Sequence, residues 1–167
     1  TLISGEATKG GYSPLQVFRN DLSASLVAQG MYEAFTYTFT SPTIFDKLCL
    51  PEDCTLRNCV KIRNPLGEDS SIMRTTTLAS MLTALSYNYN HKNPTAKLFE
   101  ITKVYIPTEA GKLPDEPEML AMGMYGNGMD FFDIKGTLEA AFDSLNMKGI
   151  TFRQVTDIPS FHPRRTA

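Results

Sequence analysis

The fold of this chain is decided by the stretch Ala96–Ile106, which reads AKLFEITKVYI. Its β-branched and aromatic residues are typical of a strand. A connection rich in Pro, Gly and acidic residues leads to a second such run, Glu118–Tyr125, which reads EMLAMGMY. Because no helical segment separates the two runs, we expect an antiparallel hairpin with a long loop. The sheet as a whole is then antiparallel or mixed, and not parallel and doubly wound.

Apolar spacing predicts helices on either side of this hairpin in the sequence. One is expected to begin after Ser13, which can cap the first turn, with Pro14 at the first helical position and Gly30 as the stop. Apolar residues three and four positions apart predict two more helices, over 76–90 and 131–145. We expect the helices to pack on one face of the sheet. The stripe of the first helix is Leu15, Phe18, Leu22 and Leu26.

Shorter elements fill the remaining chain. Strict alternation of aromatic and Thr residues over Glu33–Thr40 predicts a strand with one buried face. A short helix is expected near 41–48, and further strands at 59–63 and 150–155.

Length and composition are those of one globular domain. A chain of 167 residues can bury about 70% of its unfolded surface. We interpret residues 1–12 as an extended lead-in and 13–167 as one module. The formal net charge of −2 argues against a protein built mainly to neutralise phosphates. No apolar run approaches the roughly 20 residues that span a bilayer, and the first residues do not read as a signal peptide. We expect a piece of a longer cytoplasmic chain, with no membrane or DNA partner.

Three cysteines, Cys49, Cys54 and Cys59, suit a reducing compartment better than a disulfide framework. Only His91 and His162 could join them as zinc ligands. Buried or loop thiols are therefore favoured over a metal site.

Other chemical motifs are absent or weak. There is no phosphate-binding loop and no dinucleotide fingerprint. The paired carboxylates Glu68-Asp69, Asp115-Glu116 and Asp130/Asp133 could do acid–base work or hold Mg²⁺, but they lie where loops and helix starts are expected. The pair Arg164-Arg165 is interpreted as a solvated turn, with an anion site as the alternative.

Several segments in order carry a family resemblance. Residues 64–78 read NPLGEDSSIMRTTTL and precede the LFEI of 98–101. Residues 29–40 (QGMYEAFTYTFT), 124–126 (MYG) with 130–136 (DFFDIKG), and 162–167 (HPRRTA, with Arg164 where Gly is usual) follow the same pattern. Together they resemble the phenylalanyl-tRNA synthetase beta chain family, specifically its class II synthetase-like, catalytic-like core module of bacterial type.

This resemblance implies a fold and a lost activity. The fold would be an α/β (α+β) class II aminoacyl-tRNA synthetase core, an antiparallel or mixed sheet flanked by helices and truncated at the C-terminus. Active class II members carry Phe-Arg-x-Glu at the strand matching Lys97–Glu100, so Leu98 would occupy the lost catalytic position. Glu100 would then be structural. No catalytic, cofactor or metal residue is expected here; ATP and Mg belong to the parent enzyme.

The resemblance also implies a partner. The parent enzyme attaches phenylalanine to tRNA(Phe) as a heterotetramer of two alpha and two beta chains (α₂β₂), and this piece would support the contact with the catalytic alpha chain. The alternatives are a domain that binds an amino acid or adenylate, and a tRNA-contacting module that uses Lys61, Arg63, Arg74 and Arg164-Arg165. The candidate interface residues are Leu15, Phe18, Leu22, Met31, Tyr32, Glu33, Asn64, Pro65, Met73 and Arg74; packing inside the domain's own core is the alternative for such residues.

Overall fold

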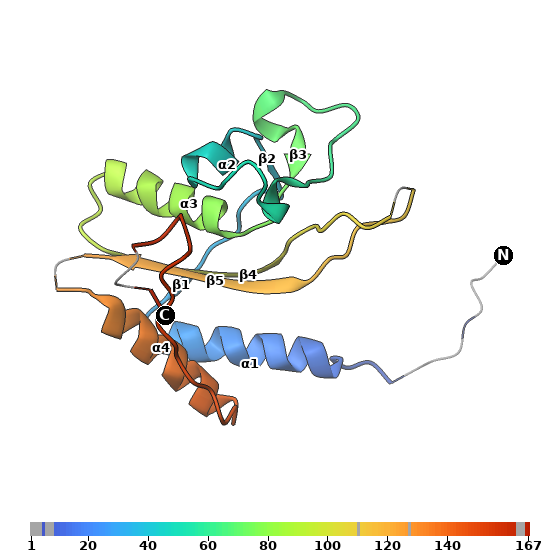
Figure 1. Ribbon diagram of the computed structural model, residues 1–167. Coiled ribbons are helices and arrows are strands. Elements are labelled where there is room, and N and C mark those ends of the chain that lie inside the picture. Colours follow the sequence, from blue (N-terminus) through green and yellow to red (C-terminus); the bar gives the residue numbers. More distant parts are fainter. Residues whose placement is uncertain (1–4, 6–8, 110, 127, 163–165) are drawn as a thin grey trace.

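A mixed three-stranded sheet lies at the centre of the computed structural model, which describes residues 5, 9–109, 111–126, 128–162 and 166–167. Strand β1 (Tyr32–Glu33) runs parallel to β4 (Ala96–Lys103), and β4 runs antiparallel to β5 (Glu118–Tyr125). The two long strands form the ribbon through the middle of Figure 1. The predicted antiparallel hairpin and mixed sheet are confirmed.

Helices cover both faces of this sheet, so the expectation of helices on one face is wrong. Helices α1 (Pro14–Ala28) and α4 (Phe131–Ser144) lie on one side, and α3 (Leu78–Asn90) lies on the other (Figure 1). The physical reason is that the hairpin carries apolar or small residues on both faces, and each face needs a cover.

The core on the side of α1 and α4 is built around Phe99, which is fully buried. Its partners come from α1, the following turn and α4. Half-buried Ile101, Leu120 and Met122 of the hairpin pack against this cluster. The buried members are Leu22, Leu26, Met31, Phe99 and Ala141.

On the opposite face, α3 lies close to the sheet because β5 has small residues there. A Cβ placed on Gly123 would lie 2.6 Å from Leu85 Cδ1 and 3.1 Å from Met81 Cγ. Side chains of α3 therefore fill the space above this strand.

The helix boundaries follow the predicted signals closely. Ser13 caps α1 and forms a reciprocal capping box with Gln16, and Asp130 caps α4. Gly30 adopts a φ of +82°, which only glycine takes without strain. No helix in the described part of the chain is both long and apolar enough to cross a bilayer.

A smaller unit sits beside α3. Strands β2 (Phe39–Thr40) and β3 (Ile72–Met73) pair antiparallel, and with α2 (Ile44–Lys47) they surround a second core. The 3₁₀ turns η1 (Thr55–Arg57) and η2 (Glu68–Ser70) complete it. The buried members of this core are Phe45, Leu48, Leu50, Ile72 and Ala79.

Two predicted strands are wrong. Over 59–63 the structure forms only an isolated bridge between Lys61 and Ile72. Over 150–155 there is no strand, and the backbone bond recorded there joins Val155 N to Thr166 O at 2.9 Å. A strand requires a ladder partner, and strand propensity alone does not supply one.

Candidate functional site

The segment 34–38, which joins β1 to β2, turns its aromatic side chains outward. Phe35 is 87% exposed and Tyr37 is 89% exposed, whereas Thr36 and Thr38 lie on the inner side and are half-buried. The prediction of one continuous strand over Glu33–Thr40 is wrong, because only Tyr32–Glu33 and Phe39–Thr40 form strands. The prediction did not say which face is buried, and the structure turns the Thr side inward. The segment leaves the central sheet after the bond from Ala34 N to Phe99 O (2.7 Å), and a polar cluster occupies the inner side.

That cluster begins with the carboxylate of Glu100, which is only 3% exposed. Its Oε1 accepts a hydrogen bond from Thr36 N at 3.0 Å, and its Oε2 accepts one from Thr36 Oγ1 at 2.7 Å. Both carboxylate oxygens are therefore used within the fold.

Arg74, also 3% exposed, closes the cluster. Its Nη1 donates to Thr36 Oγ1 at 2.8 Å and lies 3.5 Å from Glu100 Oε1. Its Nε donates to Lys103 O at 3.0 Å, and its Nη2 donates to the hydroxyl of Thr102. We call Thr36, Arg74 and Glu100 the buried network.

In the buried network, the two opposite charges are paired and their polar atoms are hydrogen-bonded within the fold. A buried ion pair recovers its desolvation cost only when the remaining donors and acceptors are bonded. Among the described residues, no buried side-chain nitrogen or oxygen lacks a hydrogen-bond partner. Because its charge is already paired and its oxygens are occupied, Glu100 is poorly suited to act as a base or to bind a substrate.

Outside the network, the aromatic side chains border a groove against α2 and α3. This aromatic groove has a volume of about 620 Å³, and all its lining residues are uncharged. Tyr87 of α3 forms part of the far wall and stacks on His91 with ring centroids 4.0 Å apart. The lining residues used below are Phe35, Tyr37, Phe39, Ile44, Thr83 and Tyr87.

The structure divides the predicted interface residues into two groups. Leu22 and Met31 belong to the core beneath the sheet, and Arg74 belongs to the buried network. Their side chains are already packed, so these three are unsuited to direct contact with a partner. The residues that remain exposed or half-buried are Leu15, Phe18, Tyr32, Glu33, Asn64, Pro65 and Met73.

Leu98 borders a hollow of about 420 Å³ at the start of β4, together with Tyr32, Asn88 and Lys97. The Asn88 amide is already used, since its Nδ2 donates to Ala84 O at 3.0 Å and its Oδ1 accepts from Asn93 Nδ2 at 2.8 Å. That Leu98 stands in the position of a lost catalytic Arg stays a prediction.

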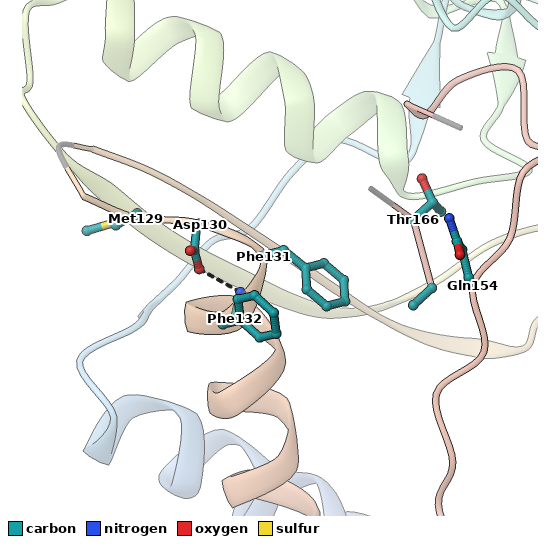
Figure 2. A pocket seen from close by; sticks show the side chains of 7 residues that line it. Met129, Asp130, Phe131, Phe132, Gln154 and Thr166 are labelled. Atoms are coloured by element: carbon teal, nitrogen blue, oxygen red, sulfur yellow. Dashed lines mark hydrogen bonds between the residues drawn. The ribbon is translucent and has the colours of Figure 1, made fainter. Parts of the chain in front are cut away.

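A further hollow of about 600 Å³ lies at the start of α4 (Figure 2). Phe131 and Phe132 meet edge to face there with centroids 5.6 Å apart. The Asp130 carboxylate borders the hollow but accepts a hydrogen bond from Phe132 N at 2.7 Å as the helix cap. Its charge therefore serves the helix start, and we assign this hollow no chemistry.

The thiols and basic residues lie apart from these features. Among the residues described, no three His, Cys, Asp or Glu side chains are grouped as a metal site. Cys54 and Cys59 pack against the second core, and burial raises the pKa of the Cys59 thiol while nearby Lys61 opposes the shift. Lys61 and Arg63 of the tRNA-contact prediction are exposed. Arg164 and Arg165 lie outside the described residues.

Sequence reasoning missed the contact of Thr36 with Arg74 and Glu100. It also missed the outward orientation of the aromatic side chains. The alternation of aromatic and Thr residues did not show that the Thr side faces the interior. The available signal was the single acid Glu100 within the otherwise apolar run LFEI of 98–101, whereas Arg74 is followed by three Thr residues and gave no such signal. Isolated charges in such runs need buried partners.

Comparisons with known proteins agree with this architecture. A family model described as the phenylalanyl tRNA synthetase beta chain CLM domain matches residues 1–167. The phenylalanine–tRNA ligase beta subunit of Clostridium acetobutylicum is 47% identical over 168 residues, covering 100% of this chain and 21% of that protein. The Clostridium tetani subunit of the same name is 44% identical with the same coverage. The chain thus spans about a fifth of the length of these relatives.

Solved structures show the same fold at low identity. A pyrrolysyl-tRNA synthetase from Desulfitobacterium hafniense superposes with a TM-score of 0.69 at 15% identity, covering 87% of this chain and 52% of that chain. A second structure from the same organism gives a TM-score of 0.67 at 13% identity, covering 87% and 50%. The fold is that of a class II aminoacyl-tRNA synthetase core, and by its full-length family match the chain belongs to the phenylalanyl-tRNA synthetase beta chain CLM domain family.

Proposed function

We propose that this chain is a structural, non-catalytic domain of a phenylalanine–tRNA ligase beta subunit that supports contact with the catalytic alpha chain. The parent enzyme would be a cytoplasmic heterotetramer that uses ATP and Mg²⁺ to attach phenylalanine to tRNA(Phe). Since the chain spans only 21% of the Clostridium acetobutylicum subunit, this activity belongs to a longer protein and its partner.

The observation that carries the proposal is the exposure of Phe35 and Tyr37 beside an uncharged groove. Aromatic side chains are enriched in protein interfaces, and charged residues are depleted at interface centres. Exposed Phe18 and Leu15 on α1 and Leu66 in the 64–67 loop add apolar surface on other elements. An alpha chain seated on the groove would cover Phe35 and Tyr37, which the domain leaves in water, whereas Leu15 and Phe18 lie on the opposite side of the sheet.

Two features support a non-catalytic role. Glu100 is held by Thr36 and Arg74, and Leu85 and Met81 fill the space above Gly123. A substrate seated against this face of the sheet would have to displace side chains of α3. Binding would therefore have to overcome existing packing.

Assembly tests the interface. We expect the Phe35→Ala, Tyr37→Ala double variant of the full-length beta chain to bind its alpha chain about tenfold more weakly or worse, as buried aromatic contacts do on truncation. Phe132→Ala is the matched control, because Phe132 is exposed on α4 away from the groove. Sedimentation of a dilution series measures the dissociation constant. Equal weakening by the control, or none by the double variant, would contradict the interface.

Isotope exchange tests the non-catalytic role. We expect the beta chain without alpha to show no phenylalanine-dependent ATP–pyrophosphate exchange, while the complex shows it. Exchange by beta alone would overturn the proposal.

The rival amino acid or adenylate site predicts saturable heats when ATP or phenylalanine is titrated into this domain. The rival tRNA contact predicts salt-dependent filter binding that falls when Lys61 and Arg63 are changed to Ala.

A further inference from the structure

We propose that Thr36 is a positioning residue of this interface: its hydroxyl, held between Glu100 and Arg74, determines that Phe35 and Tyr37 face outward beside the aromatic groove. This inference rests on the proposed function, because it concerns how the docking surface is presented. Thr36 itself is half-buried and borders the base of the groove, but its role here is to orient its neighbours and not to touch the partner.

The backbone alone holds this segment weakly. Ladder-type bonds tie it only at its two ends, from Ala34 N to Phe99 O at 2.7 Å and from Arg74 N to Thr38 O at 3.0 Å, within the described residues. Between them the inward contacts are those of Thr36, whose N and Oγ1 both bind Glu100. In extended chain, neighbouring side chains point to opposite sides, so fixing Thr36 inward fixes Phe35 and Tyr37 outward.

Two tendencies compete for this orientation. Burial of apolar area favours turning the aromatic side chains inward, and a one-residue slip would do so. That slip would remove Thr36 from Arg74 and Glu100 and leave buried charged groups with unmet hydrogen bonds, which is strongly unfavourable. The network therefore keeps the aromatic side chains in water until a partner covers them.

The buried network is also bonded to the backbone at the end of β4. Arg74 donates from Nε to Lys103 O, and its own carbonyl accepts from Tyr105 N at 2.9 Å. The position of segment 34–38 is thus fixed relative to β4, the central strand of the sheet.

The test changes the hydroxyl in the full-length beta chain assembled with its alpha chain. Thr36→Val keeps the shape and removes the hydroxyl, and Thr36→Ser keeps the hydroxyl. Thr38→Val is the matched control, since Thr38 lies on the same inner side and its hydroxyl makes no hydrogen bond within the described residues. The dissociation constant is measured well below the unfolding midpoint of every variant, so that loss of folded protein does not enter.

We expect Thr36→Val to weaken assembly at least fivefold, with Thr36→Ser and Thr38→Val within twofold of wild type. In a Tyr37→Ala background, Thr36→Val should have less than half of its logarithmic effect, because its target side chain is gone. Unchanged affinity, or equal effects in both backgrounds, would overturn the inference while leaving the interface intact. Failure of the wild-type chains to assemble, or no effect of Tyr37→Ala, would instead overturn the proposed function.

Discussion

The two sides of segment 34–39 differ in almost every physical respect. The inner side holds an ion pair and its hydrogen bonds, and the outer side holds Phe35 and Tyr37 in water. Polar groups are inside and aromatic groups outside, the reverse of ordinary burial preference. This reversal is the reason for the proposal that the outer side makes a contact outside this domain and that the inner side holds it in place.

The largest expected effect is on the inner side. Glu100→Ala should lower the free energy of unfolding by about 3–5 kcal/mol, because it leaves the Arg74 guanidinium buried without its counter-charge. Urea unfolding measures this. Glu118→Ala is the control: its exposed partner Arg19, 3.2 Å away, makes that pair worth about 0–1 kcal/mol. Similar costs for the two variants would break the comparison.

A smaller effect is expected from the hydroxyl that joins the two charges. Thr36→Val should cost about 1–3 kcal/mol of folding stability, the usual penalty for leaving buried partners unbonded. Thr38→Val should be close to neutral in the same denaturation. If Thr36→Val and Thr38→Val lower the free energy of unfolding equally, the hydrogen bonds of the Thr36 hydroxyl do not distinguish the two positions.

Substitutions on the outer side should leave the free energy of unfolding nearly unchanged. Tyr37→Ala is expected to change the free energy of unfolding by no more than about 0.5 kcal/mol, as for surface positions in general. Its effect belongs to assembly. A loss of folding stability comparable with that of Thr36→Val would show that Tyr37 packs within the domain and would remove the contrast.

The smallest effect is a pH-dependent difference between thiols. Burial raises the pKa of the Cys59 thiol above its ordinary value, so at pH 8.5 its reactive thiolate fraction is lowered. Iodoacetamide should therefore modify it more slowly than exposed Cys49. Because the folded pKa lies above the unfolded one, its contribution to stability is present below the unfolded pKa. That contribution is lost as pH rises through the folded pKa. Peptide mass spectrometry reads the rates, and their equality in 6 M urea serves as a control.

Local chemistry predicted much of the fold. Capping by Ser13 and the stop at Gly30 marked α1, and two apolar runs without a helix between them marked the hairpin. Strand propensity was a poorer guide, since 150–155 forms no strand with any of the residues that the structure describes, and 33–40 splits into two short strands. The difference is physical: caps act within a few residues, whereas a ladder needs a distant edge.

The candidate site followed the same division. The resemblance directed attention to 29–40 and 64–78, and the structure brings these segments together at Thr36, Thr38 and Arg74. It also moves Leu22, Met31 and Arg74 into the interior. The alternation of aromatic and Thr residues indicated two faces but did not indicate which one is buried.

The sequence by itself determined the helix starts, the hairpin and the family, since each depends on residues close together or on a pattern of whole segments. Only the tertiary structure decided which face of 34–39 is turned to solvent. That choice depends on Arg74 and Glu100, which lie 38 and 64 residues from Thr36 and meet it only in the folded chain. Two buried charges that must be bonded outweigh the tendency of the aromatic side chains to turn inward.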